Sequence, residues 1–144
     1  MDQRGLALFH LAKAARDEKN MQREFLYAQE SVTMLVASGT HKERVKDLMM
    51  MLMEVTERAA RYDDALRWGL EYDKLITVDS PDWGPFRLRM ANLYRRLGDR
   101  QTWQKVLEDV AIRKPGTLEA RSAQAALATE KLEGQANQYS APPL

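Results

Sequence analysis

Apolar residues recur at helical spacing in two runs, one on each side of Gly98-Asp99. The first run falls at i, i+4, i+7, i+8 and i+11 and consists of Phe86, Met90, Leu93, Tyr94 and Leu97. The second falls at i, i+3, i+4, i+7 and i+8 and consists of Trp103, Val106, Leu107, Val110 and Ala111. A spacing near 3.6 residues is that of an amphipathic helix, and a Gly-Asp pair favours a turn. The pattern predicts an antiparallel pair of helices that ends at Pro115.

Two similar helix pairs are predicted upstream. One lies within Gln3–Ser38 and turns at Lys19-Asn20; the other begins at about His41, turns near Tyr62 and is stopped by Asp79-Ser80-Pro81. Their predicted core residues are Leu8, Leu11, Ala12, Ala15, Phe25, Ala28, Val32, Leu35, Val45, Leu48, Met49, Leu52, Met53, Ala65, Trp68, Gly69, Tyr72 and Ile76. Thr117 is a candidate N-cap for a last helix that ends at about Leu132. The apolar residues of that helix are Leu118, Ala125, Leu127 and Ala128.

The segment Gly84–Thr117 resembles one tetratricopeptide repeat (TPR), because Met90, Ala91 and Tyr94 fall on the L-G-x-x-Y part of that repeat's pattern. Trp103 departs from the pattern, since the family has a small Ala there. The resemblance implies an all-α fold, namely a right-handed stack of about three antiparallel helix hairpins with a C-terminal capping helix (an α-solenoid). It also implies a single domain over residues 1–133, followed by a flexible tail over residues 134–144.

The resemblance further implies a protein-interaction module rather than an enzyme. In the TPR family the first helix of each hairpin lines a concave groove. Carried over residue by residue, this geometry predicts eight partner-binding residues: Phe9, Lys13, Met50, Glu54, Leu88, Asn92, Arg95 and Arg96. The Asn92 amide can hydrogen-bond a peptide backbone, and the two arginines can pair with carboxylates.

Charge and methionine content refine this hypothesis. The formal net charge is +1, but the segment 82–114 holds eight Lys or Arg against four acidic residues, which favours a partner with an acidic segment. The alternative is a solvated, arginine-rich helix face. Met49, Met50, Met51 and Met53 surround more than half of one helix. Met50 and Met51 are therefore predicted to face the groove or the adjacent hairpin. The alternative is that all four methionines are buried in the core.

Catalytic, cofactor and metal chemistry is not predicted. The chain has 0 Cys, His10 and His41 lie far apart, and no glycine-rich phosphate loop is present. No apolar run approaches the roughly 20 residues that cross a bilayer, and no signal peptide is recognisable, so a cytoplasmic protein without a membrane partner is expected. Two alternatives stay open: a self-assembling module of a larger repeat protein, and a nucleic-acid-binding helical repeat. The near-neutral net charge argues against nucleic acid.

Overall fold

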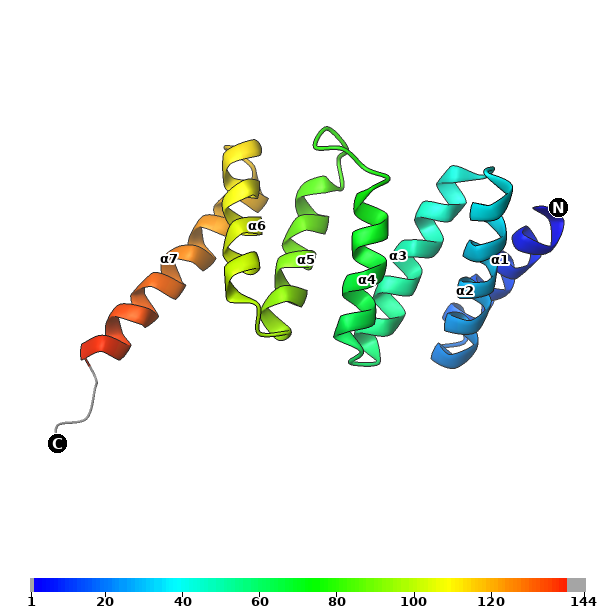
Figure 1. Cartoon of the computed structure of the whole chain (residues 1–144), viewed down its shortest axis with the longest axis horizontal. Helices are drawn as coiled ribbons and strands as arrows, with labels where there is room; N and C mark the ends of the chain where they lie inside the picture. The colour runs from blue at the N-terminus through cyan, green and yellow to red at the C-terminus, as the bar shows by residue number, and fades with distance from the viewer. Residues whose placement is uncertain (1, 140–144) are drawn as a thin grey trace. The chain divides into compact units, whose positions relative to one another are not determined.

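The computed structural model describes residues 2–139, which form seven α-helices and no strand (Figure 1). The helices are α1 (Asp2–Asp17), α2 (Met21–Ser38), α3 (Lys42–Arg58), α4 (Tyr62–Asp73), α5 (Trp83–Arg96), α6 (Arg100–Arg113) and α7 (Leu118–Tyr139). The predicted all-α class is confirmed. The contacts group into two compact units, Met1–Thr77 (unit 1) and Val78–Leu144 (unit 2). The single domain predicted over residues 1–133 stays a prediction.

Unit 1 consists of two hairpins, α1 with α2 and α3 with α4, and α2 also packs against α3. Its core is built from the predicted apolar stripes, with Leu35, Leu48, Leu52 and Met53 completely buried. Leu11 does not belong to this core, because the buried face of α1 lies on another side of the helix and leaves Leu11 47% exposed.

Unit 2 consists of the hairpin of α5 with α6, and α7 packs against both helices. The predicted stripes are buried at Phe86, Met90 and Leu93 on α5 and at Leu107 and Val110 on α6. Leu97 was predicted to extend the first stripe, but it follows the last residue of α5 and is 43% exposed.

The prediction for the last helix was wrong in register and in length. Ala120 and Ala123 are the buried residues of α7, whereas Leu118 is 67% exposed. Ala125 and Ala128 are exposed as well, and Leu127 is half-buried. The helix also continues to Tyr139, so residues 134–139 are helical rather than a tail, and residues 140–144 lie outside the described residues. The second half of α7 projects away from α6 (Figure 1).

Each hairpin reverses the chain through one residue with left-handed backbone: Lys19 (φ 60°), Ala60 (φ 60°) and Gly98 (φ 82°). In each case the following backbone N–H donates to the carbonyl oxygen five residues earlier. These bonds are Asn20 N to Ala15 O at 2.9 Å, Arg61 N to Thr56 O at 2.8 Å and Asp99 N to Tyr94 O at 2.9 Å. This is the helix-ending pattern of a Schellman motif, and the three copies give the hairpins a common register.

Side-chain caps start the next helix in two of the three hairpins. Asn20 accepts from the backbone N–H of Arg23 at 3.1 Å, and Asp99 accepts from that of Thr102 at 3.1 Å. The Thr102 hydroxyl also donates to Asp99 at 2.7 Å, and these two hydrogen bonds lower the pKa of the Asp99 carboxyl. Thr117, the predicted cap of α7, accepts from Ala120 N–H at 3.1 Å, so that prediction is confirmed.

The repeated turn leads to a paired stability prediction. Gly98→Ala should lower the free energy of unfolding by about 1 kcal/mol, because an L side chain is strained at this φ although the space around Gly98 is open. Ala60→Gly should raise it by about 0.5 kcal/mol, because the relief of strain exceeds the added entropy of the unfolded chain. Urea denaturation of each variant measures both changes.

Ala59→Gly is the matched control, since Ala59 is the neighbouring residue at φ −83° and should only be destabilised by glycine. If Ala60→Gly lowered the free energy of unfolding as much as Ala59→Gly, backbone strain at Ala60 would not determine the stability of this turn.

Candidate functional site

A pocket of about 220 Å³ lies between α1 and α3 in unit 1. Its lining residues are Phe9, Lys13, Arg16, Asp47, Met50, Met51 and Glu54. All four predicted partner-binding residues of unit 1, Phe9, Lys13, Met50 and Glu54, therefore meet at one place. We call this pocket the α1–α3 groove.

The repeated turn explains why these side chains converge. Ten and six residues before the left-handed turn residue, the first hairpin has Phe9 and Lys13, and the second has Met50 and Glu54. Because a helix repeats about every 3.6 residues, these positions share one face of each first helix. Hairpins of the same register consequently present equivalent positions to the same pocket.

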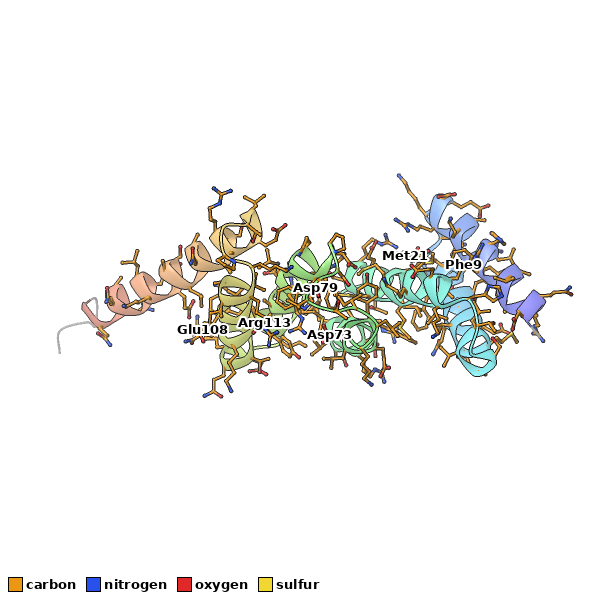
Figure 2. All side chains as sticks on the ribbon, turned by 90° about the horizontal axis from the view of Figure 1, so that it is seen from above. Phe9, Met21, Asp73, Asp79, Glu108 and Arg113 are labelled. Atoms are coloured by element: carbon orange, nitrogen blue, oxygen red, sulfur yellow. The ribbon has the colours of Figure 1, made fainter. Side chains whose placement is uncertain are left out.

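The groove has an apolar base with charges of both signs around it. Phe9, which is labelled in Figure 2, is 5% exposed, and Lys13 Nζ and Arg44 Cζ lie 5.4 and 5.8 Å from its ring centroid. Arg16 Nη2 lies 4.0 Å from Glu54 Oε2. The Phe9 ring attracts the two cations through its π-face, and the cations remain available to an anionic group at the rim.

The methionine run divides between the core and the groove. Met49 and Met53 are 8% and 0% exposed, so for these two residues the core alternative is correct. Met51 is 3% exposed but also lines the groove. Met50 alone is half-buried, and it lines the groove as predicted.

Sequence reasoning missed Glu24, which is almost completely buried at the start of α2. Its Oε1 accepts from Arg58 Nη2 at 2.9 Å, whereas its Oε2 has no hydrogen-bond partner. Burial raises the pKa of the Glu24 carboxyl, and the nearby Arg58 and Arg16 guanidinium groups oppose that shift. The signal that identifies Glu24 is its register, because it lies five residues after the turn residue, as do the buried Ala65 and Trp103.

The other four predicted binding residues lie on α5 of unit 2. Leu88 is half-buried, and Asn92, Arg95 and Arg96 are exposed. Leu88, Asn92 and Arg95 stand ten, six and three residues before Gly98, which makes them the equivalents of Phe9, Lys13 and Arg16. Whether they bind a partner stays a prediction.

Arg95 has contacts within unit 2 that the sequence analysis did not predict. Its guanidinium lies over the Trp103 ring at 5.1 Å and is 4.0 Å from Glu130 Oε2 on α7. Glu130 also pairs with Arg100 at 3.1 Å. Arg95 thus connects α5, α6 and α7. Arg95 is the equivalent of Arg16 in unit 1. Glu130 lies near Arg95 as Glu54 lies near Arg16, and Trp103 occupies the position that Glu24 has in unit 1.

The excess of basic residues in segment 82–114 is partly neutralised inside unit 2. Arg87 lies 3.9 Å from Asp109 and stacks over the Trp83 ring at 5.1 Å. Asp109 also pairs with Arg113 at 2.9 Å. The simple count of charges along the sequence therefore overstates the positive potential that this hairpin presents.

Within residues 2–139, no group of three or more His, Cys, Asp and Glu side chains is arranged to hold a metal ion. None of the helices in this range has the length and apolar character to cross a membrane.

No protein-family model matches the sequence, and no curated protein matches it. A solved structure does resemble it: the crystal structure of a Podosopora anserina protein described as a kinesin light chain with nearly identical TPR-like repeats. The two folds agree with a TM-score of 0.71 over 94% of this chain and 69% of that one, at 16% sequence identity. This chain has a TPR-like helical-repeat fold.

The TPR-like fold, an all-α solenoid class, confirms the predicted resemblance and explains the equivalent positions in the hairpins. TPR-like repeats generally mediate interactions between proteins. The TPR pattern has a small Ala at the position of Trp103, which lies five residues after Gly98. Here that position holds Glu24, Ala65 and Trp103, so two of the three hairpins accommodate a large side chain there.

Glu24 should make stability depend on pH in a definite direction. Its pKa is raised in the folded chain, so its contribution to the free energy of unfolding is fully present below about pH 4.5 and is lost as the pH rises through the folded pKa. Glu24→Gln should remove this dependence and be at least as stable as wild type at pH 7. Urea denaturation of both proteins between pH 4 and 8 measures the difference.

Glu30→Gln is the matched control, because Glu30 is an exposed residue of the same helix that pairs with the exposed Arg4. If Glu24→Gln were more destabilised at pH 7 than at pH 4, the ion pair with Arg58 would outweigh the burial of the carboxylate.

Trp103→Ala should lower the free energy of unfolding by about 3–5 kcal/mol, because the indole is 3% exposed and its removal leaves a cavity beneath Arg95. Trp68→Ala, at a half-buried tryptophan, should cost less. Thermal or urea denaturation compares the two variants. A change below about 0.5 kcal/mol at Trp103 would mean that the residue behaves as a surface side chain.

Proposed function

We propose that this chain is a non-enzymatic protein-interaction module that binds a peptide or a helix of a partner protein in the α1–α3 groove. The observation that carries the proposal is the convergence of Phe9, Lys13, Met50 and Glu54 on one pocket. TPR-like folds generally bind protein partners, and these four positions are equivalent in successive hairpins.

The size and lining of the groove support a peptide rather than a small molecule. Its volume of about 220 Å³ is below the roughly 300–1,000 Å³ of typical small-molecule pockets, but it can receive one or two side chains. Half-buried Met50 offers an adaptable apolar contact. Lys13 and Arg44 can pair with a carboxylate beside that contact, so a segment that combines an apolar and an acidic residue is favoured.

The α5 residues Leu88, Asn92 and Arg96 extend the proposal to a second contact on unit 2. They occupy or adjoin the positions equivalent to the groove residues of unit 1, and Asn92 and Arg96 are exposed. Arg95 supports this surface indirectly, because it holds α5 against α6 and α7. We propose that the protein acts in the cytoplasm as a scaffold or an adaptor.

The proposal is tested by the double variant Lys13→Ala/Met50→Ala in a crosslinking pull-down from the source cells, read by mass spectrometry. Partner capture should fall at least tenfold, since both side chains line the groove while neither is fully buried. Circular dichroism should show unchanged helicity.

The control is Leu11→Ala/Lys46→Ala, which removes one apolar and one basic side chain from the same two helices outside the groove. Equal capture by all three proteins would move the interface elsewhere. Capture of the chain by itself alone would favour the alternative of a self-assembling repeat module.

A further inference from the structure

A pocket of about 250 Å³ lies between α2 and α4 in unit 1. Its lining residues are Gln29 on α2 and Arg67, Trp68 and Glu71 on α4. None of these residues also lines the α1–α3 groove, so the two sites are separate. We call this site the Trp68 pocket.

Trp68 differs from the other two tryptophans because no cation lies over its ring among the described residues. Arg87 stacks over the Trp83 ring at 5.1 Å, and Arg95 stacks over the Trp103 ring, also at 5.1 Å. Trp83 and Trp103 are each 3% exposed, whereas Trp68 is half-buried and its indole borders the pocket. The face of an indole attracts cations more strongly than other aromatic rings do, so the Trp68 ring can accept a cation from another molecule.

At both of the other tryptophans a carboxylate accompanies the arginine. Asp109 lies 3.9 Å from Arg87, and Glu130 lies 4.0 Å from Arg95. The pocket has a carboxylate as well, because Glu71 lies three residues after its tryptophan on α4, and such residues are neighbours on a helix surface. The pocket therefore contains the indole and the carboxylate of this arrangement, and a ligand would supply the guanidinium.

We propose that the Trp68 pocket binds an arginine side chain of a partner protein, whose guanidinium stacks on the Trp68 indole and pairs with Glu71. The inference does not depend on the proposed function of the α1–α3 groove. It rests on the lining of the pocket and on the two arrangements of arginine, tryptophan and carboxylate within unit 2.

Arginine fits this pocket better than lysine because its guanidinium is planar. A planar cation lies flat on an indole and directs its N–H groups sideways, whereas an ammonium is a strongly hydrated point charge. The Glu71 carboxylate can accept two of these N–H groups, and the side-chain carbonyl oxygen of Gln29 can accept another from α2. The volume of about 250 Å³ is below the roughly 300–1,000 Å³ of typical small-molecule pockets, which favours a single long side chain.

Arg67 also lines the pocket, but its charge is offset within α4. Its guanidinium pairs with Asp64, three residues earlier. Arg61 shares that carboxylate, and Asp63 contributes a further one in the first turn of α4, so two basic and two acidic side chains balance there. Arg67 consequently does not give this end of the pocket a net positive charge that would repel a guanidinium beside Trp68.

Glu71 already pairs with Lys74, and a ligand arginine would compete for that carboxylate. Lys74 Nζ lies 3.1 Å from Glu71 Oε1, and the two side chains are 69% and 49% exposed. An exposed pair of this kind contributes little, because water screens the charges and two long side chains lose freedom. A guanidinium that stacks on the indole and forms two parallel hydrogen bonds can therefore displace Lys74.

Four pentapeptides test the proposal with the full chain, observed through the tryptophan indole N–H signals in ¹⁵N–¹H NMR spectra. They are acetyl-Ala-Ala-X-Ala-Ala-amide with arginine, citrulline, lysine or glutamate at X, and citrulline has the shape of arginine without its charge. The arginine peptide should shift the Trp68 signal and leave those of the buried Trp83 and Trp103 in place.

The arginine peptide should bind at least fivefold tighter than the citrulline and glutamate peptides, and tighter than the lysine peptide. Equal binding of the citrulline or the glutamate peptide would overturn the proposal, because the pocket would then not recognise a cation. Equal binding of the lysine peptide would overturn arginine as the ligand.

Variants locate the binding surface, with saturation transfer to the peptide as the NMR signal where the Trp68 indole is absent. Glu71→Gln and Trp68→Leu should each weaken the arginine peptide at least fivefold. Glu108→Gln is the matched control, because Glu108 is an exposed carboxylate on α6 that accepts from Gln104. Circular dichroism should show unchanged helicity, and the exposed position of Glu71 keeps the test decisive if Trp68→Leu misfolds. Unchanged binding in Glu71→Gln would overturn the proposal.

The groove variant Lys13→Ala/Met50→Ala separates this proposal from the proposed function. It should bind the arginine peptide as wild type does, whatever its effect on partner capture. Loss of peptide binding in that variant would assign the arginine to the α1–α3 groove and overturn the Trp68 pocket. Concentration-dependent self-association that Trp68→Leu abolishes would make an arginine of a second copy of this chain the ligand and would overturn a foreign partner.

Discussion

The hairpins depend on a backbone constraint, which is one left-handed residue after the first helix of each pair. At Lys19, Ala60 and Gly98 the same pattern of backbone hydrogen bonds ends the helix and reverses the chain. Only Gly98 is the residue type that adopts this conformation without strain. The turn therefore persists in two hairpins whose local sequence opposes it, so the packing of the paired helices must supply the compensating free energy.

A common turn gives each hairpin a common register, and side-chain chemistry then varies at equivalent positions. Five residues after the turn, the chain buries a carboxylate at Glu24, a methyl group at Ala65 and an indole at Trp103. Glu24 and Trp103 have different chemistry, but both lie near an Arg–Glu pair, Arg16 with Glu54 and Arg95 with Glu130. The Glu24 carboxylate attracts the nearby arginine through its charge, and the Trp103 indole attracts Arg95 through its π-face.

Periodicity was sufficient to predict the helices, because burying an apolar stripe dominates the packing of a helical repeat. Periodicity selected the wrong core residues where a large apolar side chain is exposed and a small one is buried. On α7 the sequence analysis selected Leu118, but the buried side chains are the small Ala120 and Ala123, since a helix that packs closely on two others leaves room for little more than a methyl group. Glu24 was missed for a related reason, because a charged residue does not count toward an apolar stripe even when an arginine makes its burial tolerable.

The groove residues of unit 1 could be predicted because they follow from register alone, whereas the pocket lined by Gln29, Arg67, Trp68 and Glu71 could not. It arises from the space between α2 and α4, two helices that are not consecutive, and no periodicity within one helix reveals that space.

The central position of α3 explains its composition. It packs against α2 and α4 and also lines the groove, so it needs apolar side chains around most of its circumference. Unbranched methionines meet that need without fixing one packing arrangement. A substitution at a buried residue of α3 can therefore disturb the groove and the core together. Lys13 on α1 is exposed and lines the groove, so a change there acts on the groove without loosening the core.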